Sequence, residues 1–193
     1  MKFKIKLNSI FRTRAFTLIE LLVGIVIFTL LVGSVIGVFI SAIRIQRYTL
    51  AYENLLDQSS YVMEYMSKAL RMAKKGSLGG ACTVDKNYEI KQIPSTSVNG
   101  LMFEKYDTTS GAIKCKGFFV ENNTLKDYEE GRAVSILPLL SSKIKVNAFN
   151  VNIIDETGQQ SKVTIYLEME ETSSNPHPKI KIQTAVSQRD LNQ

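Results

Sequence analysis

Glu20 is the side chain with the most unusual setting, because it lies near the start of a long apolar run. The 23 residues from Leu21 to Ile43 carry no charge. A charge inside an apolar medium costs several kcal/mol unless another group pairs with it, so such an acid predicts a functional contact. Glu20 is therefore a candidate functional residue, such as an active-site acid. The alternative is that Glu20 lies at the level of lipid headgroups and is hydrated.

Two cysteines, Cys82 and Cys115, are the next candidates for chemistry. Their spacing is not that of a zinc site or a redox pair, and the chain has a single histidine, so we expect no metal and no cofactor. If this part of the chain lies outside the cytoplasm, a disulfide is the better interpretation. It would close a loop of about 34 residues and contribute roughly 3–4 kcal/mol. Two unpaired buried thiols are the alternative.

No set of residues in the sequence predicts catalysis. His177 lies between two prolines and is expected to be exposed, and the acid pairs Glu129-Glu130 and Glu170-Glu171 are expected to be solvated. There is no phosphate-binding loop and no nucleophile with a neighbouring base. We expect that the protein is not an enzyme.

The net charge of +6 is concentrated in the first fifteen residues, which hold five basic side chains and no acidic one. The remaining chain is therefore nearly neutral, which disfavours broad electrostatic binding of nucleic acid. A local strip stays conceivable in the C-terminal region, where acidic Glu168 and Glu170 interrupt four basic residues. These are Lys162, Lys179, Lys181 and Arg189. DNA binding is thus an alternative that the sequence does not favour.

The run from Leu21 to Ile43 would span about 35 Å as a helix, enough for a hydrocarbon core of about 30 Å. It is too long for the apolar part of a removable secretory signal. Basic residues precede it and the larger domain follows, which predicts a single pass with a cytoplasmic N-terminus and the C-terminal domain outside. Arg44 and Arg47 on the far side are outnumbered by the five leader charges. Gly33 and Gly37 form a GxxxG spacing that lets helices approach closely.

Beyond Arg44 the apolar residues narrow to a stripe, which predicts that the helix continues as an amphipathic segment over residues 44–76. The expected stripe is Ile45, Tyr48, Tyr52, Leu55, Val62, Met66, Ala69 and Ala73, interrupted by Ser59. Tyrosines and methionines at 61–66 are read as core. Gly76 and Gly79-Gly80 are expected to end a helix of about 60 residues, roughly 90 Å long.

Residues 77–193 change to a period of two, which predicts strands. The clearest alternations lie at 149–153, 163–169, 180–186 and 112–121, with weaker ones near 88–93 and 101–106. Short turns separate them at 107–111, 122–123, 155–158 and 173–176. We expect an antiparallel meander with one face covered by the helix stripe. The fold class is therefore α+β, with one long N-terminal helix packed against an antiparallel β-sheet domain.

Residues 15–23, Ala-Phe-Thr-Leu-Ile-Glu-Leu-Leu-Val, resemble the processing segment of type IV prepilins and type II secretion pseudopilins. The resemblance covers roughly residues 10–45. It implies that 1–15 is a basic leader, that a prepilin peptidase cuts between Ala15 and Phe16, and that Phe16 becomes N-methylated. It also implies that Glu20 is an assembly contact, which pairs with the terminal amine of a neighbouring subunit. Removal of one partner of such a buried pair costs about 3–5 kcal/mol.

Two departures from that family are visible. Ala15 replaces the usual glycine before the cut, which predicts slower processing, and no proline occurs between Phe16 and Ile93. The resemblance implies a structural subunit, here a minor pilin or pseudopilin, of a type IV pilus or type II secretion filament. Its partners would be the cytoplasmic membrane, other pilin subunits, the prepilin peptidase and an assembly platform. The alternatives are a competence pilin that binds DNA in DNA uptake, or a single-pass membrane-anchored protein with an extracytoplasmic binding domain.

Overall fold

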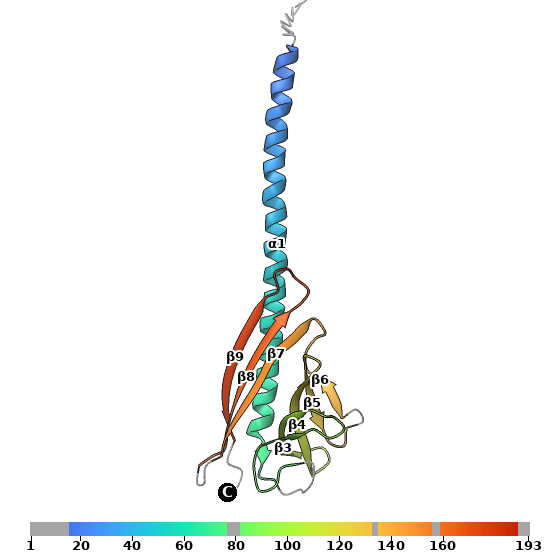
Figure 1. Ribbon diagram of the computed structural model, residues 1–193, viewed down its shortest axis with the longest axis vertical. Coiled ribbons are helices and arrows are strands. Elements are labelled where there is room, and N and C mark those ends of the chain that lie inside the picture. Colours follow the sequence, from blue (N-terminus) through green and yellow to red (C-terminus); the bar gives the residue numbers. More distant parts are fainter. Residues whose placement is uncertain (1–15, 77–81, 133–134, 156–158, 189–193) are drawn as a thin grey trace, which may run out of the picture. The chain divides into compact units, whose positions relative to one another are not determined.

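The computed structural model describes residues 16–76, 82–132, 135–155 and 159–188. The chain divides into two units, Met1–Ile45 and Gln46–Gln193. Helix α1 (Leu18–Arg71) runs across that boundary, and the strands belong to the second unit (Figure 1). The class is α+β, as expected. The leader, the Gly79-Gly80 pair, residues 156–158 of one expected turn, and Arg189 lie outside the described residues.

In the first unit, helix α1 carries no charge from Leu21 to Ile43, and all of these residues except Ile43 are exposed within the chain. A helix that is apolar all round needs an apolar environment. Two of its hydroxyl groups are satisfied internally: Thr29 donates to the carbonyl of Val26 at 2.9 Å, and Ser34 donates to that of Leu31 at 2.7 Å. This pattern suits a medium without water. By length and composition, α1 qualifies as a membrane-spanning helix.

In the second unit, one stripe of α1 is buried. Its members are Ala51, Leu55, Ser59, Val62, Met63, Met66, Ala69 and Leu70. The expected stripe is confirmed from Leu55 to Ala69, whereas Ala73 is buried but lies beyond the helix. Ser59 does not interrupt the stripe, because its hydroxyl donates to the Leu56 carbonyl at 2.8 Å. The expectation was wrong for Ile45, Tyr48 and Tyr52, which are 64%, 38% and 37% exposed, and the two tyrosines stack on each other. The separate expectation that the tyrosines and methionines at 61–66 belong to the core was wrong for Tyr61, whose side chain is exposed.

Helix α1 ends at Arg71, five residues before the expected stop at Gly76. The cause is tertiary, because the next residues form strand β1 (Ala73–Lys74), which pairs antiparallel with β3 (Asn99–Asp107). The buried Tyr88 hydroxyl donates to the carbonyl of Leu70 at 2.7 Å. This bond satisfies one of the carbonyls that a helix end leaves without an intrahelical partner.

The first sheet has six strands in the order β1-β3-β4-β5-β6, with β2 beside β1 on the same edge of β3. Its further members are β2 (Glu89–Gln92), β4 (Ala112–Glu121), β5 (Thr124–Glu129) and β6 (Ile136–Pro138). Asn122 and Asn123, with φ of 52° and 58°, form a two-residue turn between β4 and β5. Two central residues with positive φ define a type I′ hairpin turn, which Asn tolerates.

A second sheet contains β7 (Ile144–Ile154), β8 (Lys162–Glu171) and β9 (Lys179–Ser187) in the order β7-β8-β9 (Figure 1). The expected meander is therefore divided between two antiparallel sheets. Strands β5 and β6 were not foreseen. In β5, Asp127 and the partly buried Glu129 occupy positions where period two calls for apolar residues, so the alternation that marks a half-buried strand is missing.

The main core lies between the helix stripe and one face of each sheet, with Met66, Phe103, Phe118 and Leu167 among its fully buried members. A smaller cluster contains Cys82, Ile93, Met102, Cys115, Phe119 and Tyr128. It packs closely over two glycines of the first sheet. A Cβ atom at Gly117 would lie 2.5 Å from the Met102 sulfur, and one at Gly100 would lie 2.7 Å from the Phe118 carbonyl oxygen.

Candidate functional site

The N-terminal segment is organised around the start of α1. Phe16 and Thr17 precede the helix, and the Thr17 hydroxyl accepts a hydrogen bond from the backbone N–H of Glu20 at 3.3 Å. Thr17 is therefore the N-cap, and Glu20 is the third helical residue. The spacing Thr-x-x-Glu is that of a capping box, and a carboxylate in the first turn also interacts favourably with the helix dipole. Ala15 lies outside the described residues.

The Glu20 side chain is exposed, and no described residue forms an ion pair with it. Phe16 is likewise 76% exposed. A carboxylate in the first turn of an apolar helix thus remains available to a group from outside the chain. Gly33 and Gly37 also have room beside them, since nothing in the chain lies within 4 Å of a Cβ atom built at either position.

A network of buried charges lies in the second unit, between α1 and the first sheet. The Tyr65 hydroxyl donates to Asp127 Oδ2 at 2.8 Å and accepts from Lys116 Nζ at 2.8 Å. Lys116 Nζ also lies 3.0 Å from Glu129 and 3.4 Å from Asp127. Arg132 contacts both carboxylates, at 3.2 Å from Asp127 and 2.5 Å from Glu129. Two cations thus balance two anions.

Burial makes this network energetically demanding. The side chains of Lys116 and Asp127 are 5% and 2% exposed. Burial alone would lower the pKa of Lys116, but the hydrogen bond that its ammonium donates to Tyr65 and the charge of Asp127 outweigh burial, so this pKa is raised. Burial would raise the pKa of Glu129, but Lys116 and Arg132 outweigh it, so this pKa is lowered. Both pKa shifts mean that the surroundings favour the charged forms of Lys116 and Glu129.

This network of buried charges was not predicted from the sequence. The expectation that Glu129 is a solvated charge was wrong. Glu171 is a second correction, because it is fully buried and accepts hydrogen bonds from the backbone and hydroxyl of Ser173. One signal was available. The alternation that places Phe118 inward also places Lys116 inward, and a buried lysine requires a buried acid.

Nothing in the network resembles a catalytic arrangement. Lysine and carboxylate satisfy each other, and the network contains no serine, cysteine or histidine that could act as nucleophile or base. His177 is exposed, as expected. Among the described residues there is no group of three or more potential metal ligands.

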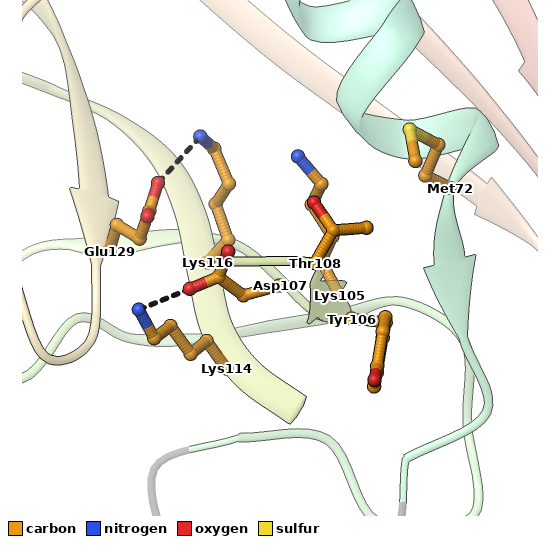
Figure 2. A pocket seen from close by; sticks show the side chains of 8 residues that line it. All are labelled: Met72, Lys105, Tyr106, Asp107, Thr108, Lys114, Lys116 and Glu129. Atoms are coloured by element: carbon orange, nitrogen blue, oxygen red, sulfur yellow. Dashed lines mark hydrogen bonds and ion pairs between the residues drawn. The ribbon is translucent and has the colours of Figure 1, made fainter. Parts of the chain in front are cut away.

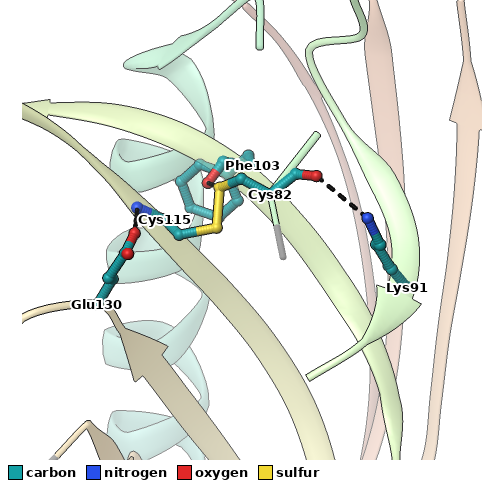
Figure 3. Close-up of a disulfide and its surroundings, with 5 residues drawn as sticks. All are labelled: Cys82, Lys91, Phe103, Cys115 and Glu130. Carbon is teal, nitrogen blue, oxygen red and sulfur yellow. Dashed lines mark hydrogen bonds between the residues drawn. A yellow bond between two sulfur atoms is a disulfide. The ribbon is translucent and has the colours of Figure 1, made fainter. Parts of the chain in front are cut away.

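Cys82 and Cys115 are joined as a disulfide, with their Cα atoms 5.6 Å apart (Figure 3). Both residues are buried in the smaller core cluster. The backbone N–H of Cys115 donates to Glu130 at 3.2 Å, and Lys91 Nζ donates to the Cys82 carbonyl at 3.4 Å. The bridge ties the segment after β1 to the centre of β4.

The basic residues proposed as a local strip are largely neutralised where the structure describes them. Lys179 pairs with Glu170 at 3.1 Å, and Lys181 pairs with Glu168 at 3.3 Å. Each pair joins residues directly opposite on β8 and β9. Neighbouring acids therefore take up the charge that a phosphate backbone would need.

Residues 10–43 match the family model of the prokaryotic N-terminal methylation motif. This motif is the prepilin-type signal for cleavage and methylation. Comparison with curated proteins and with solved structures gave no match. Together, the motif and the long apolar helix fit a membrane-anchored, pilin-like chain that assembles with other subunits, and they indicate a structural protein.

Proposed function

We propose that this chain is a minor structural subunit of a type IV pilus or of a type II secretion-type filament. The observation that carries the proposal is the methylation motif at residues 10–43, placed across the start of a helix of 54 residues. In this proposal, residues 1–15 are the leader, 16–43 the membrane-spanning half of the helix, 44–76 its amphipathic half and 77–193 the extracytoplasmic domain. A prepilin peptidase cuts between Ala15 and Phe16, and Phe16 is then N-methylated.

The role proposed for Glu20 is an intersubunit ion pair with the methylated amine of Phe16 on a neighbour. Support comes from the exposure of Glu20 and from the absence of an ion-pair partner for it in the described part of the chain. Cleavage creates the required cation, because the amine does not exist while Ala15 is attached. Processing would thus act as a switch that permits assembly.

The mass of the N-terminal peptide tests the processing step. The protein is isolated from its native membrane, digested, and its first peptide is measured by mass spectrometry. We expect a peptide that begins at Phe16 and carries one additional methyl group. A peptide that begins at Met1, or a start beyond Ile43, would contradict the proposal.

Two substitutions of Glu20 test the assembly contact. Glu20→Ala and Glu20→Gln should both be cut before Phe16 normally and both be depleted from filaments, because neither supplies an anion for the amine. The measurement is the ratio of filament-bound to membrane-bound subunit, with Glu53→Gln as a matched control at an exposed position of the same helix. Normal incorporation of Glu20→Gln would show that charge pairing is not required.

A further inference from the structure

A small cavity lies where β3 and β4 approach their connecting turn, beside the end of α1 (Figure 2). Its volume is about 90 Å³, and its lining includes Met72, Lys105, Tyr106, Lys114 and Lys116. A single buried water needs only roughly 10–15 Å³, so the cavity has room for a larger group. The lining also contains the carboxylates of Asp107 and Glu129, so three ammonium groups meet two carboxylates and the lining carries one net positive charge.

The lysines of this cavity are not equally neutralised. Lys114 pairs with Asp107, and Lys116 pairs with Glu129. Lys105 lies directly opposite Lys114 on the neighbouring strand, and none of the described residues forms an ion pair with it. Like charges directly opposite in an antiparallel pair are destabilising. Asp107 already balances the charge of Lys114, so an anion beside Lys105 would supply the counter-charge that this side of the pair lacks.

Two lining residues, Met72 and Tyr106, present partly exposed apolar atoms. Met72 is 48% exposed and Tyr106 is 41% exposed, and Lys74 Nζ lies 5.0 Å from the centre of the Tyr106 ring. Exposed apolar atoms in the lining suit an anion carried on a hydrocarbon stem. The carboxylate of a Glu or Asp side chain has such a stem, whereas a free phosphate has none.

We propose that this cavity binds the carboxylate of an acidic side chain on a partner protein, with Lys105 as its principal ligand and Met72 and Tyr106 in contact with the stem. The site is separate from the methylation motif, and the inference does not depend on processing or filament assembly. Among the lining residues, three lysines against two carboxylates leave one spare cation, Lys105. One cation matches one carboxylate, and it does not match the run of phosphates of a nucleic acid.

The test uses the full-length chain in detergent micelles, with the methionine methyl groups labelled with carbon-13. The Met72 resonance is assigned from a Met72→Leu variant and followed during titration with the blocked tripeptide Gly-Glu-Gly. The matched probe is the blocked tripeptide Gly-Gln-Gly, which has the same size without the charge. We expect a saturable shift of the Met72 signal with the glutamate peptide only.

Variants assign the binding to Lys105. Lys105→Gln should weaken binding of the glutamate peptide by at least about tenfold, because a charge-assisted hydrogen bond is lost, and Lys105→Arg should retain it. Lys143→Gln removes the same charge from an exposed turn and should leave binding unchanged. The other methionine signals report whether each variant is folded.

Three results would overturn the inference. The first is no shift with the glutamate peptide, and the second is an equal shift with the glutamine peptide. The third is equally tight binding of inorganic phosphate with the same dependence on Lys105, which would identify a site for free anions.

Discussion

The loss of stability on removing one side chain of the buried charge network depends on which charged groups are then left buried without a partner. Lys116 is almost fully buried, and its neighbours Tyr65, Asp127 and Glu129 hold it in the charged form. Removing one partner of a buried ion pair leaves the other charge without compensation, whereas removing both can be nearly neutral. The exposed pairs on β8 and β9 lack this property, because water replaces the missing partner.

Asp127→Ala is expected to lower the free energy of unfolding by about 3–5 kcal/mol, because it deprives Lys116 and Arg132 of a buried anion. Urea denaturation of the full-length protein in detergent micelles measures this. The double variant Lys116→Met with Asp127→Leu should be less destabilised than Asp127→Ala, since it leaves only the Glu129–Arg132 pair. Lys181→Ala, at an exposed pair, should leave the midpoint unchanged. Equal loss in the single and double variants would contradict the account.

The lowered pKa of Glu129 predicts the direction of the acid dependence. A carboxylate whose pKa is lower in the folded state stabilises the fold above its unfolded pKa, about 4.3, and this stabilisation is lost as the pH falls through the folded value. The urea midpoint should therefore fall below about pH 4.3. Glu129→Gln should make that fall shallower while lowering the midpoint at pH 7. An unchanged acid slope would exclude Glu129 as a contributor.

The elements show which features of this fold are readable from sequence. The long helix was predictable because its uncharged run and its stripe have a single interpretation, and β4, β7, β8 and β9 follow from clear alternation. The end of α1 could not be predicted from the sequence, because Ala73 and Lys74 form β1 only through their pairing with β3. The division into two sheets was not readable either, since short connections predict neighbouring strands without saying where a sheet ends.

The candidate site divides in the same way. Residues 15–23 are contiguous, so the processing motif can be recognised from the sequence alone. The buried network joins Tyr65 on α1 to Lys116 on β4 and Asp127 on β5, and it becomes visible only when the fold brings these elements together. The same holds for Lys105 and Lys114, whose opposition depends on the register of β3 and β4.

Gly37→Ala tests whether α1 packs closely against another helix. Within the chain nothing would contact the added methyl group, so the substitution should not harm the isolated protein. Alanine favours a helix over glycine by about 1 kcal/mol, so helix content in micelles should be equal or higher. If the GxxxG spacing mediates close contact between subunits, incorporation into filaments should fall. Gly24→Ala is the matched control, and equal incorporation of both variants would remove the packing role.

For the whole molecule, the disulfide secures a part of the domain that the helix does not reach. The smaller core cluster has few members and includes both cysteines. The bridge joins residues 33 positions apart, so it restricts the unfolded chain considerably. An oxidising compartment is required for such a bond to persist, in agreement with the proposed extracytoplasmic location.

Replacing both cysteines by alanine should lower the free energy of unfolding by roughly 3–4 kcal/mol in the chain-entropy model. The measurement is urea denaturation of the full-length protein in micelles, compared with the native chain before and after reduction under denaturing conditions. The reduced native chain should resemble the double variant. If reduction left the midpoint unchanged, the bridge would have no role in stability.

The tight packing over Gly100 and Gly117 bears on how this domain diverges over evolution. Most surface positions can drift, but at these two glycines even one carbon atom would collide with Phe118 or Met102. Distant descendants should therefore keep both glycines together with Cys82 and Cys115 after overall identity has faded. Relatives of this domain should be recognisable by the two glycines and the two cysteines, because the N-terminal motif defines only the class of leader and carries no information about the domain that follows it.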